Sequence, residues 1–438
     1  METGILVGLI VFFLGIVIGL PLCWVFLASS ISMLTLLNSS LSFMAGTYYH
    51  ALNSYILMAI AFFILAGSLM ASAGLAEKLV LFSHVIVGKI KGGMIAVGIV
   101  ATLFLSALTG SSVPCISALI PLLVGPLEKY GYERRYTTAV LCSSSFLGYL
   151  IPPSVPVLIY CLIAHQSVAA VFLSTVIPGL LLAGGYMLLN YFICDKYMHA
   201  PTEEIHDMTK KEKVKAIWGA LPALGCPVIV LVGIYGGICT PNEAGALAVI
   251  YTLLIGLWVY RKLDRESIWQ STRSALISLG MVFVLIAFGT VFARVLTREG
   301  VAQLMATSVI GLFQNKLLIL LMINVLLLVL GMFIDGIPIL IVVVPLILPL
   351  ITNIDMNLVH LGAVIVLNIG IGVITPPYAI SIFVGSRLSG VSYDKLVKPM
   401  SLFLFIVAIP VLLLTTYIPA LSCWLPTLIL GSKVVGSW

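Results

Sequence analysis

Long apolar segments dominate this chain and constrain its fold more than any single motif does. Of its 438 residues, 61% are hydrophobic and only 9% are charged, whereas a soluble domain carries about 25% charged residues. About 20 apolar residues cross a lipid bilayer as a helix, and segments of this kind recur along the whole chain. The composition therefore predicts an all-α polytopic membrane protein and excludes a soluble domain, a disordered chain and a nucleic-acid binder.

The basic residues predict which ends of the apolar segments face the cytoplasm. Residues 195–216 form the most hydrophilic segment and contain five lysines. Loops rich in Lys and Arg stay on the cytoplasmic side, so we expect a cytoplasmic loop here. A second basic cluster, at Arg261, Lys262 and Arg265, follows an apolar run long enough for two spans. Two spans return the chain to the same side, in agreement with the charge rule.

The two halves of the chain repeat one another at a constant offset of 224 residues. Pro114 aligns with Pro338 at this offset, and the pair Pro152-Pro153 aligns with Pro376-Pro377. Because proline has a fixed effect on the backbone, its recurrence at one offset indicates a duplicated fold.

The charges of the linkers indicate that the two repeats are inverted in the membrane. The linker 128–135 is basic, whereas its counterpart 352–359 contains no Lys or Arg. Further along the polarity reverses, because residues 163–170 have no Lys or Arg while the matching part of the second half contains Arg387. Equivalent linkers then lie on opposite faces, which is the architecture of inverted-repeat transporters.

Two apolar segments are predicted to be re-entrant helical hairpins. Residues 92–127 have lysines on both sides, at Lys91 and Lys129, and a polar tip at 109–112. The equivalent segment, residues 317–350, has its tip at 334–336 and would enter from the other face. Backbone outside helices is tolerated at membrane depth only where protein or a wet cavity covers it. We therefore expect the two tips to face a cavity near the middle of the membrane.

Each Pro-Pro pair is expected to split a membrane helix in two, because proline cannot donate to the carbonyl four residues earlier. The carbonyls freed in this way belong to Gly148, Tyr149, Gly372 and Val373. A simple kink without a ligand is the alternative. Two matched breaks, each opposite a hairpin tip, favour a pair of Na⁺ sites.

Polar residues at the tips are candidates for substrate binding. Ser111 and Ser112 provide hydroxyls and free N–H groups at a helix start, which suit a carboxylate. Asp335, followed by Gly336, is an acid inside the membrane and a functional candidate by default, although a helix cap is the alternative. Asn368 either reaches the ligand or holds two helices together.

The remaining polar residues are interpreted as structural. Glu243, in the segment TPNEAG, is interpreted as part of a helix cap. Arg294 and Arg298 are assigned to an interfacial linker rather than to a binding site. The eight cysteines and six histidines are dispersed, so we expect fillers of the core and no metal cluster.

These motifs resemble those of the large membrane subunit of TRAP (tripartite ATP-independent periplasmic) transporters, the DctM-like group of the ion transporter superfamily. The matching segments, in the order of the family, are FFILAGSLM (62–70), LTGSSVP (108–114), GYLIPPS (148–154), GGICTPNEAGA (236–246), GMFIDGIPILIVVVPLILP (331–349) and NIGIGVITPP (368–377). Two departures are Gly245, where the family usually has Ala, and the tip DGIP, where many members have a small hydroxyl residue after the Asp.

The resemblance implies Na⁺-driven uptake of an organic acid across the bacterial inner membrane by an elevator mechanism. The implied partners are a small four-helix membrane subunit and a periplasmic substrate-binding protein. The implied Na⁺ ligands are Ser106, Thr109, Gly148, Ile151 and Pro153 for one site, and Gly331, Gly372, Thr375 and Tyr378 for the other. The implied parts are scaffold helices (1–91 and 217–316), transport-domain halves (92–194 and 317–438, the latter with the C-terminal helix) and the cytoplasmic loop.

Two alternatives remain open at this point. A stand-alone Na⁺/dicarboxylate carrier of the same superfamily would need no binding protein, but such carriers have Ser-Asn-Thr at their tips and this chain does not. An intramembrane enzyme would need a nucleophile paired with a base, or a metal cluster. Neither Ser111 nor Ser112 has a histidine or lysine nearby in the sequence.

Overall fold

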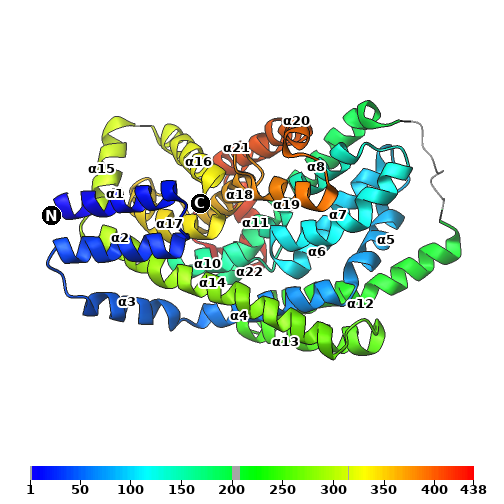
Figure 1. Cartoon of the computed structure of the whole chain (residues 1–438), viewed down its shortest axis with the longest axis horizontal. Helices are drawn as coiled ribbons and strands as arrows, with labels where there is room; N and C mark the ends of the chain where they lie inside the picture. Colours follow the sequence, from blue (N-terminus) through cyan, green and yellow to red (C-terminus); the bar gives the residue numbers. More distant parts are fainter. Residues whose placement is uncertain (1, 200–207, 314) are drawn as a thin grey trace.

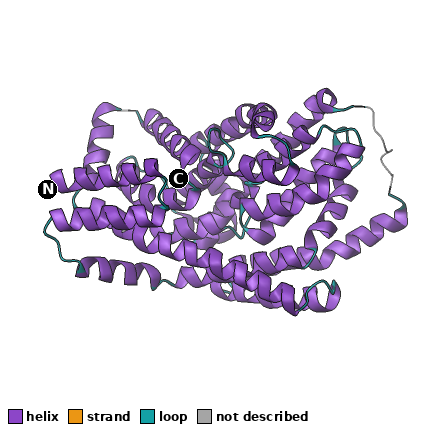
Figure 2. Ribbon diagram, in the orientation of Figure 1, coloured by secondary structure: helices purple, strands orange, loops and turns teal. Residues whose placement is uncertain are grey.

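The structure is a computed structural model that describes residues 2–199, 208–313 and 315–438. These residues form helices joined by short loops, without a β-strand among them (Figure 2). In the described part of the chain, ten helices are long and apolar enough to cross a membrane. The predicted all-α polytopic architecture is therefore confirmed.

The first half of the chain contains eleven α-helices. They are α1 (Glu2–Ile18), α2 (Leu22–Leu36), α3 (Ser42–Leu52), α4 (Tyr55–Ser72), α5 (Leu75–Val87), α6 (Gly93–Thr109), α7 (Ser112–Lys129), α8 (Arg134–Ser144), α9 (Leu147–Leu150), α10 (Val155–Ala164) and α11 (Val168–Ile193), after which a short 3₁₀ turn follows at Cys194–Tyr197.

The second half contains the corresponding helices and a C-terminal extension. They are α12 (Lys210–Tyr235), α13 (Pro241–Leu254), α14 (Arg265–Arg298), α15 (Val301–Leu312), α16 (Lys316–Phe333), α17 (Gly336–Asn353), α18 (Leu358–Gly372), α19 (Ile380–Ser389), α20 (Tyr393–Phe403), α21 (Ile409–Tyr417), α22 (Ala420–Leu430) and α23 (Ser432–Val435). Single π-helical turns follow α13 at Ile255–Val259 and α20 at Leu404–Ala408.

The helix boundaries repeat at the offset found in the sequence. α7 covers Ser112–Lys129 and α17 covers Gly336–Asn353, so both their first and last residues differ by 224. α8 and α18 also begin 224 residues apart, at Arg134 and Leu358. The halves differ where α3 and α4 are separate helices, because the second half has a single helix of 34 residues there, α14. These boundaries support the predicted duplication.

Capping boxes determine where the helices α12 and α13 begin. Thr209 and Glu212 exchange hydrogen bonds at the start of α12, so the predicted loop 195–216 is helical from Lys210 onward. Residues 200–207 of that predicted loop lie outside the described part of the chain. Thr240 and Glu243 form the same motif at α13, which confirms the capping role predicted for Glu243. A cap of this kind contributes about 1 kcal/mol to helix stability.

Two pairs of helices form hairpins that approach each other from opposite ends of the molecule. The open end of the α6–α7 pair lies beside the end of α11, where Asn190 donates to the Gly92 carbonyl at 2.9 Å. At the end of the α16–α17 pair that lies away from its tip, Lys316 Nζ donates to the Asp355 carbonyl at 3.3 Å. Figure 1 shows the first pair toward the right of the molecule and the second toward the left.

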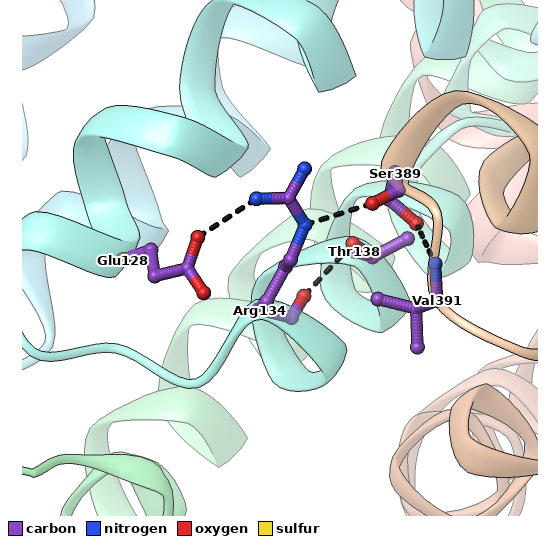
Figure 3. A network of polar contacts seen from close by, with 5 residues as sticks. All are labelled: Glu128, Arg134, Thr138, Ser389 and Val391. Atoms are coloured by element: carbon purple, nitrogen blue, oxygen red, sulfur yellow. Dashed lines mark hydrogen bonds and ion pairs between the residues drawn. The ribbon is translucent and has the colours of Figure 1, made fainter.

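An arginine at the start of α8 joins the two halves at the end where the basic linkers lie. Arg134 Nε donates to the Ser389 carbonyl at 2.7 Å, and its guanidinium forms an ion pair with Glu128 at 2.7 Å (Figure 3). The start of α8 therefore touches the end of α19. This contact is consistent with the charge pattern, which placed both the 128–135 linker and Arg387 on the cytoplasmic side.

Burial separates a central group of helices from an outer group. All residues of α18 from Val359 to Gly372 are buried, as expected for a helix that is apolar on every side. In the segment Arg134–Ala164, 83% of the apolar stretch is buried, against 28% in α16. Outer helices instead present large apolar side chains at the surface, such as Val17 on α1 and Trp218 on α12, which are 83% and 70% exposed. Such faces suit contact with lipid.

Candidate functional site

The two hairpin tips line one cavity of about 560 Å³, and α4 and α14 form its opposite wall. The polar residues of its lining are Ser68, Ser72, Thr109, Ser111, Ser112, Ser117, Tyr149, Ser274, Ser278, Asp335 and Ser381. Asp335 is the only charged residue among those described around this cavity. The cavity expected between the tips is therefore present.

The first tip packs directly against the break between α9 and α10. Gly110 ends α6 in the left-handed region, with φ of 59°, and its carbonyl accepts from Val155 N at 3.4 Å. A methyl group on Gly110 would come within 2.6 Å of the Pro153 carbonyl oxygen, and one on Gly148 within 2.7 Å of the Ser111 carbonyl oxygen. Only glycine permits so close an approach of two backbones.

Three polar side chains cluster beneath the first tip. Thr109 Oγ1 donates to the Leu105 carbonyl at 3.1 Å and lies 3.2 Å from Cys115 Sγ. Ser106 Oγ lies 3.7 Å from the same sulfur. Cys115 thus connects the two side chains expected near one Na⁺ site, although its isolated position in the sequence indicated only a filler.

Three serine hydroxyls connect the first tip to both halves of the chain. Ser112 Oγ lies 3.1 Å from Ser145 Oγ and 3.1 Å from Ser381 Oγ, and the latter two are 3.2 Å apart. All three residues are buried. Ser112 begins α7, Ser145 follows α8 and Ser381 lies in α19, so this cluster joins the tip of one repeat to the broken helix of the other.

The second tip places an acid at the start of a helix. Asp335 precedes α17 with extended backbone and makes no side-chain capping hydrogen bond. Its side chain lines the cavity instead. Behind it, Gly331 of α16 and Gly372 of α18 meet backbone to backbone, since a methyl group on Gly372 would lie 2.7 Å from the Gly331 Cα.

Most of the carbonyls expected to be free at the two breaks have acquired partners. The Tyr149 carbonyl accepts from Ser154 Oγ at 2.6 Å. The Gly372 carbonyl accepts from Thr375 N at 3.0 Å, and the Val373 carbonyl from Ser381 N at 3.2 Å. Among the described residues, no hydrogen bond reaches the Gly148 carbonyl.

The expectation of four free carbonyls was therefore wrong for three of them, because hydroxyls and N–H groups beyond each break turn back onto the chain. A bonded carbonyl keeps a second lone pair, so these oxygens still suit a small hard cation. Both Pro-Pro peptide bonds, Pro152-Pro153 and Pro376-Pro377, are cis.

The residues expected to bind Na⁺ lie around the cavity rather than in its wall, with Thr109 as the exception. Ile151 turns its side chain toward α11, where its Cδ1 would lie 3.0 Å from a methyl group on Gly179. Thr375 Oγ1 donates to the Ile371 carbonyl at 2.7 Å. Tyr378 is 58% exposed, and its ring lies 5.8 Å from that of Phe383, centroid to centroid.

Four of the five residues expected to contact substrate line the cavity, namely Ser111, Ser112, Asp335 and Gly336. Asn368 does not. It is fully buried, and its Nδ2 donates to Asn324 of α16, 3.0 Å from Oδ1 and 3.1 Å from the carbonyl. The structure thus places Asn368 between two helices, which was the alternative role.

The wall that faces the tips was not predicted from the sequence. Ser68 and Ser72 on α4, and Ser274 and Ser278 on α14, line the cavity from that side. Ser68 also donates to the Ser271 carbonyl of α14 at 2.9 Å, which ties the two helices together. Serines four residues apart share a helix face, so two such pairs in separate apolar segments were the signal that could have revealed this wall.

The polar groups that line this cavity are suited to binding a small polar ligand. The described residues contain no group of three or more His, Cys, Asp and Glu side chains that could hold a metal ion. The starts of α7 and α17 open toward the cavity, and helix starts attract anions. Two matched tips and two matched breaks around one cavity define a membrane transport protein.

Comparison with known proteins identifies the family. The family described as "Tripartite ATP-independent periplasmic transporter, DctM component" matches residues 9–421. The chain belongs to this family of transporters, and the proposed resemblance is confirmed. Because the family and its named relatives are transporters, the intramembrane enzyme is set aside.

Two relatives and one solved structure illustrate the similarity. The isethionate TRAP transporter permease protein DctMQ of Oleidesulfovibrio alaskensis is 34% identical over 94% of this chain and 64% of its own length. The chain therefore spans less than two thirds of that relative. The sialic acid TRAP transporter large permease protein SiaM of Vibrio cholerae is 33% identical over 97% of this chain and 99% of its own length. The YdaH transporter of Alcanivorax borkumensis has a similar fold, with a TM-score of 0.60 at 13% identity over 85% of this chain and 86% of that one.

Proposed function

We propose that this chain is the large permease subunit of a Na⁺-coupled TRAP transporter that imports an organic acid across the bacterial inner membrane. The observation that carries the proposal is the single cavity between the two hairpin tips in a chain of the DctM family. The named relatives handle a sulfonic acid and a sugar acid, so an organic anion is the substrate class we propose.

The charge of the cavity supports coupling to a cation. An organic anion would meet the helix starts of α7 and α17, but it would also meet Asp335, and no Lys or Arg is among the described residues that line the cavity. Two like charges in one cavity repel each other. Na⁺ bound beside the tips would offset this repulsion. Anion and cation would then bind cooperatively and cross together.

We propose that the hairpins and broken helices move as one unit against α4 and α14. Two contacts would hold that unit together across the repeats, the serine cluster at Ser112 and the Arg134–Ser389 hydrogen bond. The wall on α4 and α14 is lined by small residues, such as Gly67, Ala71 and Ser278, which leave room for sliding. An elevator movement of this unit would carry the cavity from one side of the membrane to the other, with both hairpins re-entrant.

The proposed partners follow from the name of the family. A tripartite periplasmic transporter has two further components, which we propose to be a small four-helix membrane subunit and a periplasmic substrate-binding protein. The stand-alone Na⁺/dicarboxylate carrier is the alternative to this assignment. It requires no delivery protein, but carriers of that kind have Ser-Asn-Thr at their tips, which this chain lacks.

Uptake by reconstituted vesicles tests the proposal. The chain and its small subunit would be placed in proteoliposomes with an inward Na⁺ gradient, with and without the binding protein, and offered labelled isethionate, sialic acid and a dicarboxylate. We expect uptake of one organic acid that requires both Na⁺ and the binding protein. Na⁺-driven uptake without the binding protein would support the stand-alone carrier. Uptake that is independent of Na⁺ would contradict the coupling.

A further inference from the structure

A second cavity of about 470 Å³ lies farther along some of the same helices. On α14, the first cavity is lined by Ser278 and Val282 and the second by Ile286, Thr290 and Arg294. These residues are four apart, and each is turned about 40° from the one before, so they form a continuous stripe that winds partly around α14. The two cavities therefore occupy successive parts of one track along α14.

The hairpin unit provides the other wall of both cavities in the same order. On α17, Ile337 lines the first cavity and Ile341 the second. On α10, Pro156 lines the first cavity and Ile159 the second. The second cavity thus lies farther from the tips, toward the end of the molecule opposite the basic linkers.

The second cavity has the opposite charge to the first. Arg294 is the only lysine or arginine among the described residues that line either cavity. It lies inside α14, so the earlier assignment to an interfacial linker was wrong: the helix continues to Arg298. His50, His165, Thr290 and Asn53 surround the same space.

Arg294 is available to bind a ligand. Its side chain is exposed, and it makes no ion pair or hydrogen bond with the described part of the chain. The neighbouring Arg298 is differently placed, because its guanidinium lies 4.0 Å from Glu299 and 5.1 Å from the centre of the Phe43 ring. An unpaired guanidinium beside hydroxyl and imidazole groups is a suitable anchor for a carboxylate or sulfonate.

We infer that the second cavity is a receiving site for the organic anion, with Arg294 as its anchor. This inference rests on the proposed transport function and adds to it. The anion would bind here from the side opposite the basic linkers, before the tips reach it. Arg294 lies about 24 Å beyond Ser278 on α14, at 1.5 Å per residue, so movement of the hairpin unit along the track would bring the tips toward it.

Thiol labelling tests the charge of this cavity without requiring transport. Thr290→Cys would be treated in proteoliposomes with an anionic methanethiosulfonate that carries a sulfonate, and separately with a cationic one of similar size. Labelling of the parent chain, which contains eight cysteines, provides the background. The measured quantity is the labelling rate with the anionic reagent divided by that with the cationic reagent. We expect this ratio to be about tenfold higher for Thr290→Cys than for Ser278→Cys, which lies in the cavity that contains Asp335. The reason is that a lining charge concentrates ions of opposite sign.

Two arginine variants isolate the anchor. Arg294→Gln in the Thr290→Cys chain should abolish the preference for the anionic reagent, whereas Arg298→Gln, which removes the same charge four residues away, should preserve it. A preference that survives Arg294→Gln, or that falls equally with Arg298→Gln, would overturn the inference.

Protection identifies the ligand. Isethionate, sialic acid and a dicarboxylate would each be added separately. One of them should slow labelling of Thr290→Cys by the cationic reagent, and this protection should be lost in the Arg294→Gln chain. Protection by vesicles of an anionic phospholipid but not by the organic acid would show that the site binds lipid phosphate, and the inference would fail. Because labelling does not depend on Na⁺-driven uptake, failure here and failure of the transport proposal remain distinguishable.

Discussion

Gly331 and Gly372 lie in direct backbone contact, with 2.7 Å between the position of a methyl group on Gly372 and the Cα of Gly331. The contact joins α16, one arm of the second hairpin, to the end of α18, just before the second break. It leaves no space for any side chain at either position. The alignment of this hairpin with the broken helix therefore depends on two glycines 41 residues apart in the sequence.

Gly372→Ala should separate α16 from α18 and impair the site. Overpacking of this kind costs about 1–3 kcal/mol, so we expect a lower unfolding temperature and a large loss of uptake. Gly184→Ala is the matched control, because a methyl group there meets nothing within 4 Å. The unfolding temperature in detergent and the initial uptake rate measure the two effects. Normal uptake by Gly372→Ala would contradict the proposed role of this contact.

Asp335→Asn should lower the apparent affinity of the transporter for Na⁺. The amide keeps the size of the side chain but removes the only charge described around the first cavity. We expect the Na⁺ concentration for half-maximal uptake to rise at least about tenfold, which corresponds to about 1.4 kcal/mol of binding free energy. Asp394→Asn, on the α20 helix away from the cavity, is the control. If the Na⁺ dependence is the same in both variants, Asp335 has no part in coupling.

Single cysteines should report the inverted arrangement of the repeats. Lys129→Cys lies at the end of α7 and Asp355→Cys lies two residues beyond the end of α17. We expect a membrane-impermeant thiol reagent to label them from opposite sides. Lys395→Cys should be labelled from the same side as Lys129→Cys, because Arg134 and Ser389 are in contact near these positions. Labelling of positions 129 and 355 from one side would exclude inverted repeats.

Ser278→Leu should obstruct the first cavity from the α14 side. The added volume lies opposite the tips, so the hairpin unit could no longer approach this part of α14. We expect the maximal uptake rate to fall about tenfold, equivalent to about 1.4 kcal/mol in the barrier, while Ser278→Ala remains close to the parent. Equal rates for the two variants would show that this wall does not limit movement.

Signals carried by single residues predicted much of the fold. Proline and glycine act locally on the backbone, so Pro114 and Pro338 indicated matching helices, and the structure begins α7 and α17 at matching positions. The tips were also predictable, because polar residues such as Ser111 and Asp335 interrupt otherwise apolar segments. Both residues line the cavity.

Features that depend on distant contacts were not predictable in this way. The partner of Asn368 is Asn324, on another helix, and no local pattern distinguishes such a pair from a ligand contact. The Val373 carbonyl is satisfied by Ser381 N only because the chain turns back after the break. Arg294 was misplaced because an arginine near the end of an apolar run is usual in a linker, whereas α14 is long enough to include it.

The stripe on α14 has polar residues at both ends and only Val282 and Ile286 in its centre. The side chains of Val282 and Ile286 offer no ligand to a Na⁺ ion. Removing Na⁺ from its water ligands without replacing them costs far more than thermal energy. Under the proposed movement of the hairpin unit, this stretch would therefore oppose the passage of Na⁺ ions that no organic anion accompanies. Under the proposed coupling, the sodium gradient would then be preserved during any cycle in which no organic acid is captured.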